Sequence, residues 1–250
     1  MDSSNSFVLV TGALGGIGAA IVFKLLKNGH KVVATDIRVP TNNQDGNIFV
    51  QMDLQRFVTD SIYASSKNDE IYKAANGGKC SGIVSNAAEQ LIKPIKDFSV
   101  KDILDVITVN SLATLSLTQC FWDDLSAING KVISIGSVHD MLSKPTFGGY
   151  AISKATLSAV TRAISLESEG KFTTLTISPG AIETNMLLEG FKEFPEKYND
   201  LINILPTRRL GAPSDVADLV SFIMETKSNY LNGSEIRIDG GISGRLHDPL

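Results

Sequence analysis

A tyrosine, a lysine and a serine have the types and spacing of a proton-transfer site. Tyr150 precedes Lys154 by four residues, and Ser137 lies thirteen residues before the tyrosine. A phenol is a poor acid–base group at neutral pH, because its ordinary pKa is near 10. Residues four apart share a helix face, so the charge of Lys154 would lower the pKa of Tyr150. With Ser137 holding a substrate oxygen, these residues predict proton transfer at an alcohol or carbonyl, although Tyr–Lys pairs alone are common.

Length and composition narrow the class of protein. The chain has 250 residues, of which 43% are hydrophobic, and a net charge of -4 that argues against a nucleic-acid partner. The sequence contains no run of about 18 apolar residues, so we expect no membrane-spanning helix. Residues 1–6 lack the features of a signal peptide, so we expect a cytoplasmic protein. Cys80 and Cys120 have no metal-ligand spacing, so we expect reduced thiols and no metal site.

Short apolar runs alternate with longer amphipathic stretches along the whole chain. This alternation predicts a single α/β domain over residues 1–250, with a doubly wound parallel sheet of about seven strands and helices on both faces. The runs expected to be strands are 7–10, 31–35, 48–52, 82–85, 131–135, 174–177 and 236–238.

Local signals place several helix ends. A helix over 17–28 is expected to end at Gly29, Ser99 and Asp102 form a predicted capping box, and Pro213 should open a late helix. The segment 184–209 fits no strand position. It is either a pair of surface helices or a lid over a ligand site at the carboxyl ends of the strands, and we favour the lid.

A glycine-rich turn, residues 11–18, directly follows the first expected strand and opens the first helix. Glycines let a backbone approach a phosphate closely, and a helix N-terminus offers unpaired N–H groups and positive dipole charge. This context predicts binding of a pyrophosphate, with a merely flexible turn as the alternative. The residues expected to contact it are Thr11, Gly12, Leu14, Gly15, Gly16, Ile17 and Gly18.

Acidic residues follow the second and third expected strands. Asp36 could accept hydrogen bonds from both ribose hydroxyls of an adenosine and would repel a 2′-phosphate, which favours NAD over NADP. Arg38 opposes that preference if it reaches a phosphate, whereas its alternative is a solvated loop charge. Ile37 should lie beside the same ribose. Asp53 and Leu54 would bracket the adenine, or Asp53 would simply cap a helix.

Taken together, these motifs resemble the short-chain dehydrogenase/reductase family, in its smaller single-domain branch. The resemblance extends from about Ser6 to Gly241 and implies a Rossmann-like fold. It depends on the glycine turn, Ser85-Asn86-Ala87-Ala88, Asn110, Ser137, Tyr150 with Lys154, Pro179-Gly180, residues 206–216 and the closing Asp239-Gly240-Gly241.

The resemblance implies a catalytic role for four residues. Tyr150 would be the general acid–base, and Lys154 would lower its pKa and hold the nicotinamide ribose. Ser137 would orient the substrate oxygen. Asn110 would keep a water that links Lys154 to solvent, with a satisfied core amide as the alternative.

The same resemblance implies further cofactor contacts. Asn86 and Ala87 would lie beneath the cofactor, near the adenine ribose. The nicotinamide side would be lined by Pro179, Gly180, Ile182 and Thr184, where Thr184 could instead be a helix N-cap. Two departures stand out: Ser85 and Ala88 replace the asparagine and glycine usual in this motif, and the glycine spacing also fits the family's extended branch, for which this chain has no room.

The expected activity is NAD(P)-dependent hydride transfer between a secondary alcohol and a ketone, with NAD favoured. Residues just after strand ends suggest a small polar substrate: Glu89, Gln90, His139, Asp140 and, on the lid, Met186. A solvated loop role is the alternative for each. A catalytically silent dinucleotide-binding sensor or scaffold is the competing function. The resemblance also implies a homotetramer or homodimer through helices near 99–125 and 150–166, where Ala151, Ala155, Ala159 and Ala163 recur.

Overall fold

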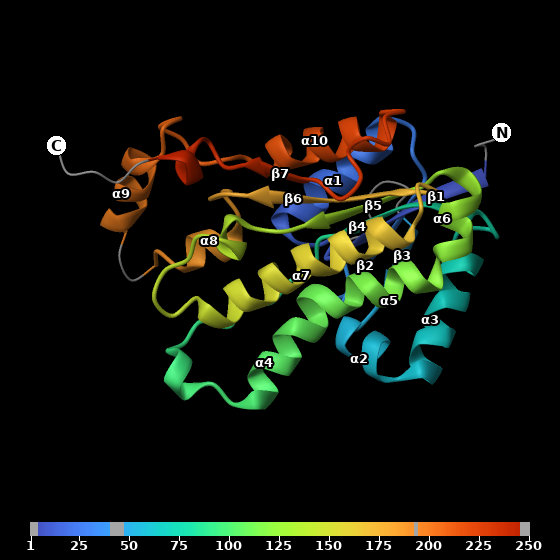
Figure 1. Ribbon diagram of the computed structural model, residues 1–250, viewed down its shortest axis with the longest axis horizontal. Helices are drawn as coiled ribbons and strands as arrows, with labels where there is room; N and C mark the ends of the chain where they lie inside the picture. Colours follow the sequence, from blue (N-terminus) through green and yellow to red (C-terminus); the bar gives the residue numbers. More distant parts are fainter. Residues whose placement is uncertain (1–4, 41–47, 193–194, 246–250) are drawn as a thin grey trace.

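A computed structural model of the chain describes residues 5–40, 48–192 and 195–245. Its centre is a seven-stranded sheet in the order β3-β2-β1-β4-β5-β6-β7, in which every neighbouring pair is parallel (Figure 1). The sheet confirms the predicted α/β class and the strand positions. Its strands are β1 (Ser6–Thr11), β2 (Val32–Asp36), β3 (Ile48–Gln51), β4 (Lys79–Ser85), β5 (Lys131–Ile135), β6 (Thr173–Pro179) and β7 (Glu235–Ile238).

The strand order reverses beside β1. The chain runs outward from β1 to β3, then returns to place β4 on the other side of β1 and continues outward to β7. Ligands of such sheets bind in the crevice that opens at the carboxyl ends of the strands where the order reverses. The glycine turn follows β1 and residues 86–90 follow β4, so both lie at this reversal.

Helices cover both faces of the sheet. In Figure 1, α1 (Gly16–Lys27) and α10 (Pro213–Glu225) lie on one face, and α3 (Ser61–Ala74), α5 (Ala113–Cys120) and α7 (Gly148–Glu167) lie on the other. The remaining helices are α2 (Leu54–Thr59), α4 (Val100–Ile107), α6 (Trp122–Ile128), α8 (Asn185–Glu189) and α9 (Glu196–Ile204).

The sequence of β1 shows why the strands read as unbroken apolar runs. Successive strand side chains point to opposite faces, so a sheet covered on both sides needs apolar residues at every position. Phe7 and Leu9 pack in the core beneath α5, whereas Val8 and Val10 pack in the core beneath α1 and α10. All four side chains are fully buried.

The predicted helix ends are confirmed. Ser99 accepts a hydrogen bond from the Asp102 backbone N–H at 3.1 Å, and Asp102 accepts one from the Ser99 N–H at 2.8 Å, which completes the capping box of α4. Pro213 opens α10. Helix α1 ends at Lys27, followed by Gly29 with a φ of +84°, a backbone conformation that glycine adopts readily.

One continuous helix, Val100–Cys120, joins α4 and α5 through a π-helical turn, η3 (Thr108–Leu112). Among the described residues it is long and apolar enough to cross a membrane by length and composition alone. It packs instead against α7 and β4, as the core helix of a globular fold does. The π turn was not foreseen from the sequence.

The segment 184–209 forms α8 and α9, and residues 193–194 within it lie outside the described part. The rings of Phe191 and Tyr198 meet edge to face at 5.8 Å. The Tyr198 hydroxyl donates to the Glu183 carboxylate at 2.9 Å, so α9 is tied to the loop that leaves β6.

Candidate active site

The glycine turn packs against the end of β4 too closely for any side chain. A Cβ on Gly18 would lie 2.1 Å from the carbonyl oxygen of Gly12, and one on Gly12 would lie 2.7 Å from the Cα of Ala87. Gly12 also has a φ of +63°. Real Cβ atoms do not approach other atoms this closely, so the turn requires glycine at both positions.

Thr11 and Asn86 join the turn to β4 by four hydrogen bonds. The Thr11 hydroxyl accepts from the backbone N–H groups of Asn86 and Ala87, at 3.0 and 3.1 Å. The Asn86 side-chain amide donates to the carbonyls of Thr11 and Gly12, both at 3.1 Å. The Asn86 side chain therefore fixes the shape of the turn through its backbone carbonyls.

Helix α1 starts at this turn without a side-chain cap. Its N-cap residue is Gly15, and its first turn contains no acidic residue. The first N–H groups of a helix have no partner within the helix, so these face the loop as potential anion donors. A Cβ on Gly16 would lie 2.9 Å from the Thr184 methyl carbon, which shows how closely the segment after β6 approaches the turn. A close-packed turn with an uncapped helix start fits a dinucleotide pyrophosphate.

Asp36 ends β2 beside the turn, as predicted, and is nearly buried. Its carboxylate accepts hydrogen bonds from Leu14 and from Arg38, and Arg38 forms an ion pair with it. Burial disfavours the charge of Asp36, but the bonds from Arg38 and Leu14 outweigh burial and hold the pKa below its ordinary value. Arg38 is therefore a partner of Asp36 rather than the solvated charge considered from the sequence. Ile37 between them is exposed.

Asp53 caps α2, as one of its two expected roles required. Its carboxylate accepts from the Arg56 backbone N–H at 3.1 Å. The adjoining Leu54 is buried in the core. Contact of either residue with an adenine remains a prediction.

Tyr150, Lys154 and Ser137 meet at the carboxyl end of β5. Tyr150 lies in the first turns of α7, Lys154 follows one turn later, and Ser137 is the N-cap of the short 3-10 helix η4 (Val138–Asp140). The Ser137 side chain lies near enough to the Tyr150 hydroxyl to act on its pKa. The Lys154 ammonium lies 5.6 Å from the centre of the tyrosine ring and donates to the Ile135 carbonyl at 2.8 Å. The side chains of Tyr150 and Lys154 are 9% and 2% exposed.

The pKa of the phenol differs from the sequence-based expectation. Burial raises the pKa of Tyr150 to about 12, and the neighbouring Ser137 side chain opposes this rise to a smaller extent. The pKa of Tyr150 is therefore raised overall rather than lowered, because removal of the phenol from water is the larger effect, and the influence of the Lys154 charge on it remains a prediction. Burial also lowers the pKa of Lys154 to about 8, so the amine remains mostly charged at neutral pH.

Asn110 lies on the π turn and is almost completely buried. Its carboxamide oxygen accepts from the Glu89 N–H at 2.8 Å. Its amide nitrogen donates to the Glu89 carbonyl and the Ser153 hydroxyl, both at 2.9 Å. Ser153 in turn donates to the Tyr150 carbonyl at 2.7 Å. The carboxamide is a satisfied core amide that joins the loop after β4 to α7. A bound water at Asn110 remains a prediction.

An aromatic stack borders the tyrosine. His139 stacks on Phe147 with ring centres 5.0 Å apart, and both rings meet Tyr150 edge-on, at 5.8 and 6.5 Å. The Lys144 ammonium lies 4.2 Å from the Phe147 ring centre. Burial, with a smaller contribution from Lys144, lowers the pKa of His139, so the imidazole is neutral at pH 7. Sequence reasoning selected His139 but missed Phe147, whose position three residues before Tyr150 was the available signal.

Comparison with known proteins decides the family. A family model described as enoyl-(acyl carrier protein) reductase matches residues 12–243. The chain belongs to the short-chain dehydrogenase/reductase family.

Relatives in this family are dehydrogenases and reductases. Glucose 1-dehydrogenase of Gluconobacter oxydans is 28% identical over 94% of this chain and 91% of its own length. Acetoacetyl-CoA reductase of Allochromatium vinosum is 28% identical over 94% and 97%. The solved structure of Thermoplasma acidophilum aldohexose dehydrogenase superimposes with a TM-score of 0.90, at 22% identity, over 100% of this chain and 98% of that one. The structural likeness confirms the Rossmann-like fold.

The short-chain dehydrogenase/reductase pattern is altered at Ser85. Its hydroxyl pairs with the Thr114 hydroxyl on α5 at 2.6 Å, so it braces β4 against a helix. The turn itself is held by Asn86. The departure at Ser85 therefore leaves the glycine turn intact.

The residues expected on the nicotinamide side follow β6. Gly180 donates its N–H to the Ile238 carbonyl at 3.0 Å, and Ile182 forms a bridge with Gly211 and is buried. Thr184 is the N-cap of α8, accepting from Leu187, as its alternative role required. These bonds fix residues 179–184 at the end of the sheet. Three of the expected substrate residues, Glu89, Gln90 and Met186, are exposed, whereas His139 and Asp140 are half-buried.

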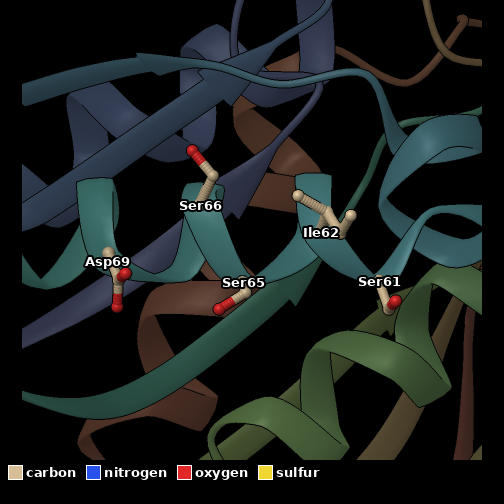
Figure 2. A pocket seen from close by; sticks show the side chains of 5 residues that line it. All are labelled: Ser61, Ile62, Ser65, Ser66 and Asp69. Atoms are coloured by element: carbon tan, nitrogen blue, oxygen red, sulfur yellow. The ribbon is translucent and has the colours of Figure 1, made fainter.

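A surface hollow of about 500 Å³ lies elsewhere, along α3 (Figure 2). Its labelled side chains, Ser61, Ile62, Ser65, Ser66 and Asp69, all come from this one helix. It contains none of the predicted site residues. A second hollow, of about 340 Å³, adjoins the predicted nicotinamide side at Ile182 and extends to Leu205 and Asp239.

Proposed function

We propose that this protein is an NAD(H)-dependent oxidoreductase that interconverts a secondary alcohol and a ketone on a small polar substrate. The observation that carries the proposal is the buried group of Ser137, Tyr150 and Lys154 at the carboxyl end of β5. These residues lie at the carboxyl ends of the strands, as does the glycine turn, whose shape fits a pyrophosphate. A protein that only bound dinucleotides would have no need of a phenol paired with a buried ammonium.

The residues divide the work of the reaction. A bound nicotinamide supplies the acceptor or donor of hydride. In oxidation, the Tyr150 oxygen takes the hydroxyl proton of the substrate, and in reduction it returns that proton to the carbonyl oxygen. Ser137 holds the substrate oxygen beside the phenol. The Lys154 ammonium stabilises the negative charge of tyrosinate. This stabilisation is needed because burial of the phenol disfavours that charge.

The residues present also fit the cofactor at its other end. The uncapped start of α1 offers N–H groups to the pyrophosphate, and Asp36 offers a carboxylate to the adenosine ribose. Pro179, Gly180, Ile182 and Thr184 would line the nicotinamide. NAD(H) is the proposed cofactor because a carboxylate at the end of β2 accepts ribose hydroxyls.

A polar substrate is supported by the residues near the phenol. The neutral imidazole of His139 lies edge-on to Tyr150, and Glu89 follows β4 at the same end of the sheet. The relative that oxidises glucose, at 28% identity, agrees with a sugar or polyol. Segment 184–209 would close over this substrate, with Met186 on α8 facing it.

The proposed assembly is a homotetramer or homodimer in the cytoplasm. Val100 and Leu104 on α4 are 78% and 58% exposed, and Ala155, Ala159 and Ala163 form an exposed stripe on α7. Small residues allow a second helix to approach closely. Sedimentation analysis should give a mass of two or four chains, and a monomer would contradict this proposal.

Absorbance at 340 nm tests the activity directly. Purified protein with NAD or NADP should reduce the cofactor in the presence of polar secondary alcohols, and exclusive turnover of large apolar alcohols would reject the polar substrate. Tyr150→Phe should lower kcat by about 10²–10⁴-fold, the usual contribution of a general acid–base, while leaving NADH binding within about twofold. Near-normal turnover by that variant would overturn the assignment.

A further inference from the structure

The loop between η4 and α7, residues 141–147, brings a positive charge to the edge of the tyrosine site. The Lys144 ammonium lies 4.2 Å from the centre of the Phe147 ring. The same ring stacks on His139 with centres 5.0 Å apart and meets Tyr150 edge-on at 6.5 Å. Phe147 therefore lies against both the ammonium and the phenol.

The charge of Lys144 has no counter-ion in the part of the chain that the structure describes. No carboxylate there forms an ion pair with its ammonium, and burial alone lowers its pKa. Two acidic side chains that follow β5 and β6 have other partners. The Asp140 carboxylate accepts from the Ser158 hydroxyl at 3.3 Å, and the Glu183 carboxylate accepts from the Tyr198 hydroxyl at 2.9 Å. An ammonium that is partly withdrawn from water without a counter-ion favours a negatively charged ligand.

The backbone of the loop holds Lys144 in this place. Thr146 has a φ of +72°, a left-handed conformation that is unfavourable for a β-branched residue. Its carbonyl accepts from the Lys93 N–H at 3.0 Å, and the Phe147 N–H donates to the Lys144 carbonyl at 3.2 Å. Strained backbone persists where surrounding contacts hold it, and it is concentrated at ligand sites. The turn therefore gives Lys144 a defined position beside Phe147.

We propose that the substrate carries a carboxylate, which Lys144 binds while Tyr150 and Ser137 hold the reacting oxygen. The proposal rests on the oxidoreductase function proposed above and narrows its substrate to a hydroxy acid and the corresponding keto acid. The carboxylate itself does not react: the hydride leaves the carbinol carbon for the nicotinamide, and the hydroxyl proton goes to the Tyr150 oxygen.

His139 provides a further polar group beside the same ring stack. Its neutral imidazole contacts the rings of both Phe147 and Tyr150. Its Nδ1 is buried and has no hydrogen-bond partner among the described residues. Buried polar atoms are nearly always hydrogen-bonded, so an unpaired one at this place agrees with a polar ligand that completes the site.

Matched pairs of substrates test for the carboxylate. Each pair shares one carbon skeleton, with a carboxylate in one member and a hydroxymethyl group in the other: lactate with propylene glycol, glycerate with glycerol, and gluconate with sorbitol. The absorbance of NADH gives kcat and KM for the wild type, Lys144→Met and Lys144→Arg. The matched control is Lys73→Met, because Lys73 is an exposed lysine in the last turn of α3, at the opposite edge of the sheet.

The acid should be preferred within the best pair. Its kcat/KM in the wild type should exceed that of its polyol by at least about tenfold, the lower end for a hydrogen bond to a charged group, because Lys144 is partly open to water. Lys144→Met should reduce the preference to about twofold or less, through a higher KM for the acid rather than a lower kcat. Lys144→Arg should keep most of the preference, and Lys73→Met should keep all of it.

Binding without turnover gives a second measurement, which decides alone if no pair is oxidised. Calorimetry compares propionate with its neutral analogue propionamide, each added to the complex of the protein with NADH. Propionate should bind the wild type at least about tenfold more tightly than propionamide, and Lys144→Met should bind the two about equally.

Two results would overturn the proposal: a wild type that does not favour the carboxylate in these measurements, or a preference that survives in Lys144→Met. If alcohols are still oxidised with NAD, the oxidoreductase function stands and Lys144 is only a cation–π partner of Phe147. If NADH does not bind and no alcohol or acid is oxidised, the proposed function fails and this inference fails with it.

Discussion

The nucleotide end and the catalytic end of this sheet are built by different means. At the nucleotide end, backbone groups and glycines make the site: Gly12 and Gly18 leave no space for a Cβ, and Thr11 and Asn86 bind backbone atoms. At the catalytic end, buried ionisable side chains make the site, with Tyr150 and Lys154 both displaced from their ordinary pKa values by burial.

The two ends should therefore tolerate different substitutions. A site made from close backbone contacts depends on shape, so one added carbon should destroy it whatever its charge. A site made from buried charges depends on chemistry, so a side chain of equal size but different charge should destroy its function and leave its shape.

Gly18→Ala should have the largest effect. The new Cβ would lie 2.1 Å from the Gly12 oxygen and 2.7 Å from the Asn86 amide nitrogen, so the turn must move. We expect NADH binding to weaken by at least about 100-fold, and stability to fall by about 1–3 kcal/mol, as overpacking usually costs. Fluorescence quenching and urea unfolding measure the two. Gly244→Ala, where a Cβ meets nothing within 4 Å, is the control. A Gly18→Ala variant that binds NADH normally would remove the contrast.

Lys154→Met should act in the opposite way. Met has a similar length without the charge, so kcat should fall by about 10²–10⁴-fold while NADH binding changes much less. Burial lowers the pKa of Lys154 to about 8, which means that the charged amine opposes folding at neutral pH, and removing it offsets part of the loss of its hydrogen bond. The unfolding free energy should therefore change by less than about 2 kcal/mol, the cost of leaving the Ile135 carbonyl without its donor.

The pH dependence of the oxidation rate tests whether the charge of Lys154 acts on Tyr150. Without the ammonium, tyrosinate is harder to form, so the rise of the oxidation rate with pH should move to higher pH in Lys154→Met. Lys154→Arg, which keeps a positive charge, should shift it less. Equal pH profiles for the wild type and both variants would show that the lysine charge does not act on Tyr150.

Asp53→Ala should have a smaller effect, because Asp53 serves as a helix cap. Loss of its bond to Arg56 N–H should lower the free energy of unfolding by about 1 kcal/mol. Asp53→Asn should keep most of that stability, since asparagine also caps helices. NADH binding should be within about twofold of the wild type in both. Strong weakening by Asp53→Asn, with stability unchanged, would instead place Asp53 at the adenine.

The two ends also differ in how far the sequence predicts them. The strands and the glycine turn are recognisable from local sequence patterns. A continuous apolar run such as that of β1 predicts a strand buried on both faces. A glycine-rich turn directly after such a strand predicts a phosphate-binding turn. Tyr150, Lys154 and Ser137 come together as expected because helix spacing and strand ends determine where they lie. Burial and contacts between residues that are far apart in the sequence could not be predicted in the same way.

Three particulars show what was missed and why. The pKa of Tyr150 rises because several elements enclose the phenol, and enclosure is a property of the packed fold. The ion pair between Arg38 and Asp36 depends on the rotamer of the exposed Arg38 side chain. The π turn that presents Asn110 has no distinct residue pattern, and only the structure shows that its carboxamide joins Glu89 to Ser153.

Glu235→Gln should give the smallest effect, and one visible only through pH. Glu235 on β7 accepts from the Ser178 hydroxyl at 2.8 Å and lies 3.9 Å from Arg237. Burial and the nearby carboxyl group of Asp140, on the 3-10 helix that follows Ser137, raise its pKa, whereas Ser178 and Arg237 oppose this. A raised pKa in the folded state means that protonated Glu235 stabilises the fold at low pH, and that this stability is lost as pH rises through the folded pKa.

Glutamine resembles the protonated acid, so the variant should escape that loss. Relative to the wild type, Glu235→Gln should gain up to about 1 kcal/mol in unfolding free energy between pH 5 and pH 8, measured in urea. Glu225→Gln is a control of opposite sign. Bonds from Asn28 and Ser221 lower the pKa of Glu225, so its stability is present at neutral pH and lost in acid. If Glu235→Gln is less stable than the wild type by the same amount at both pH values, protonation of Glu235 does not stabilise the fold.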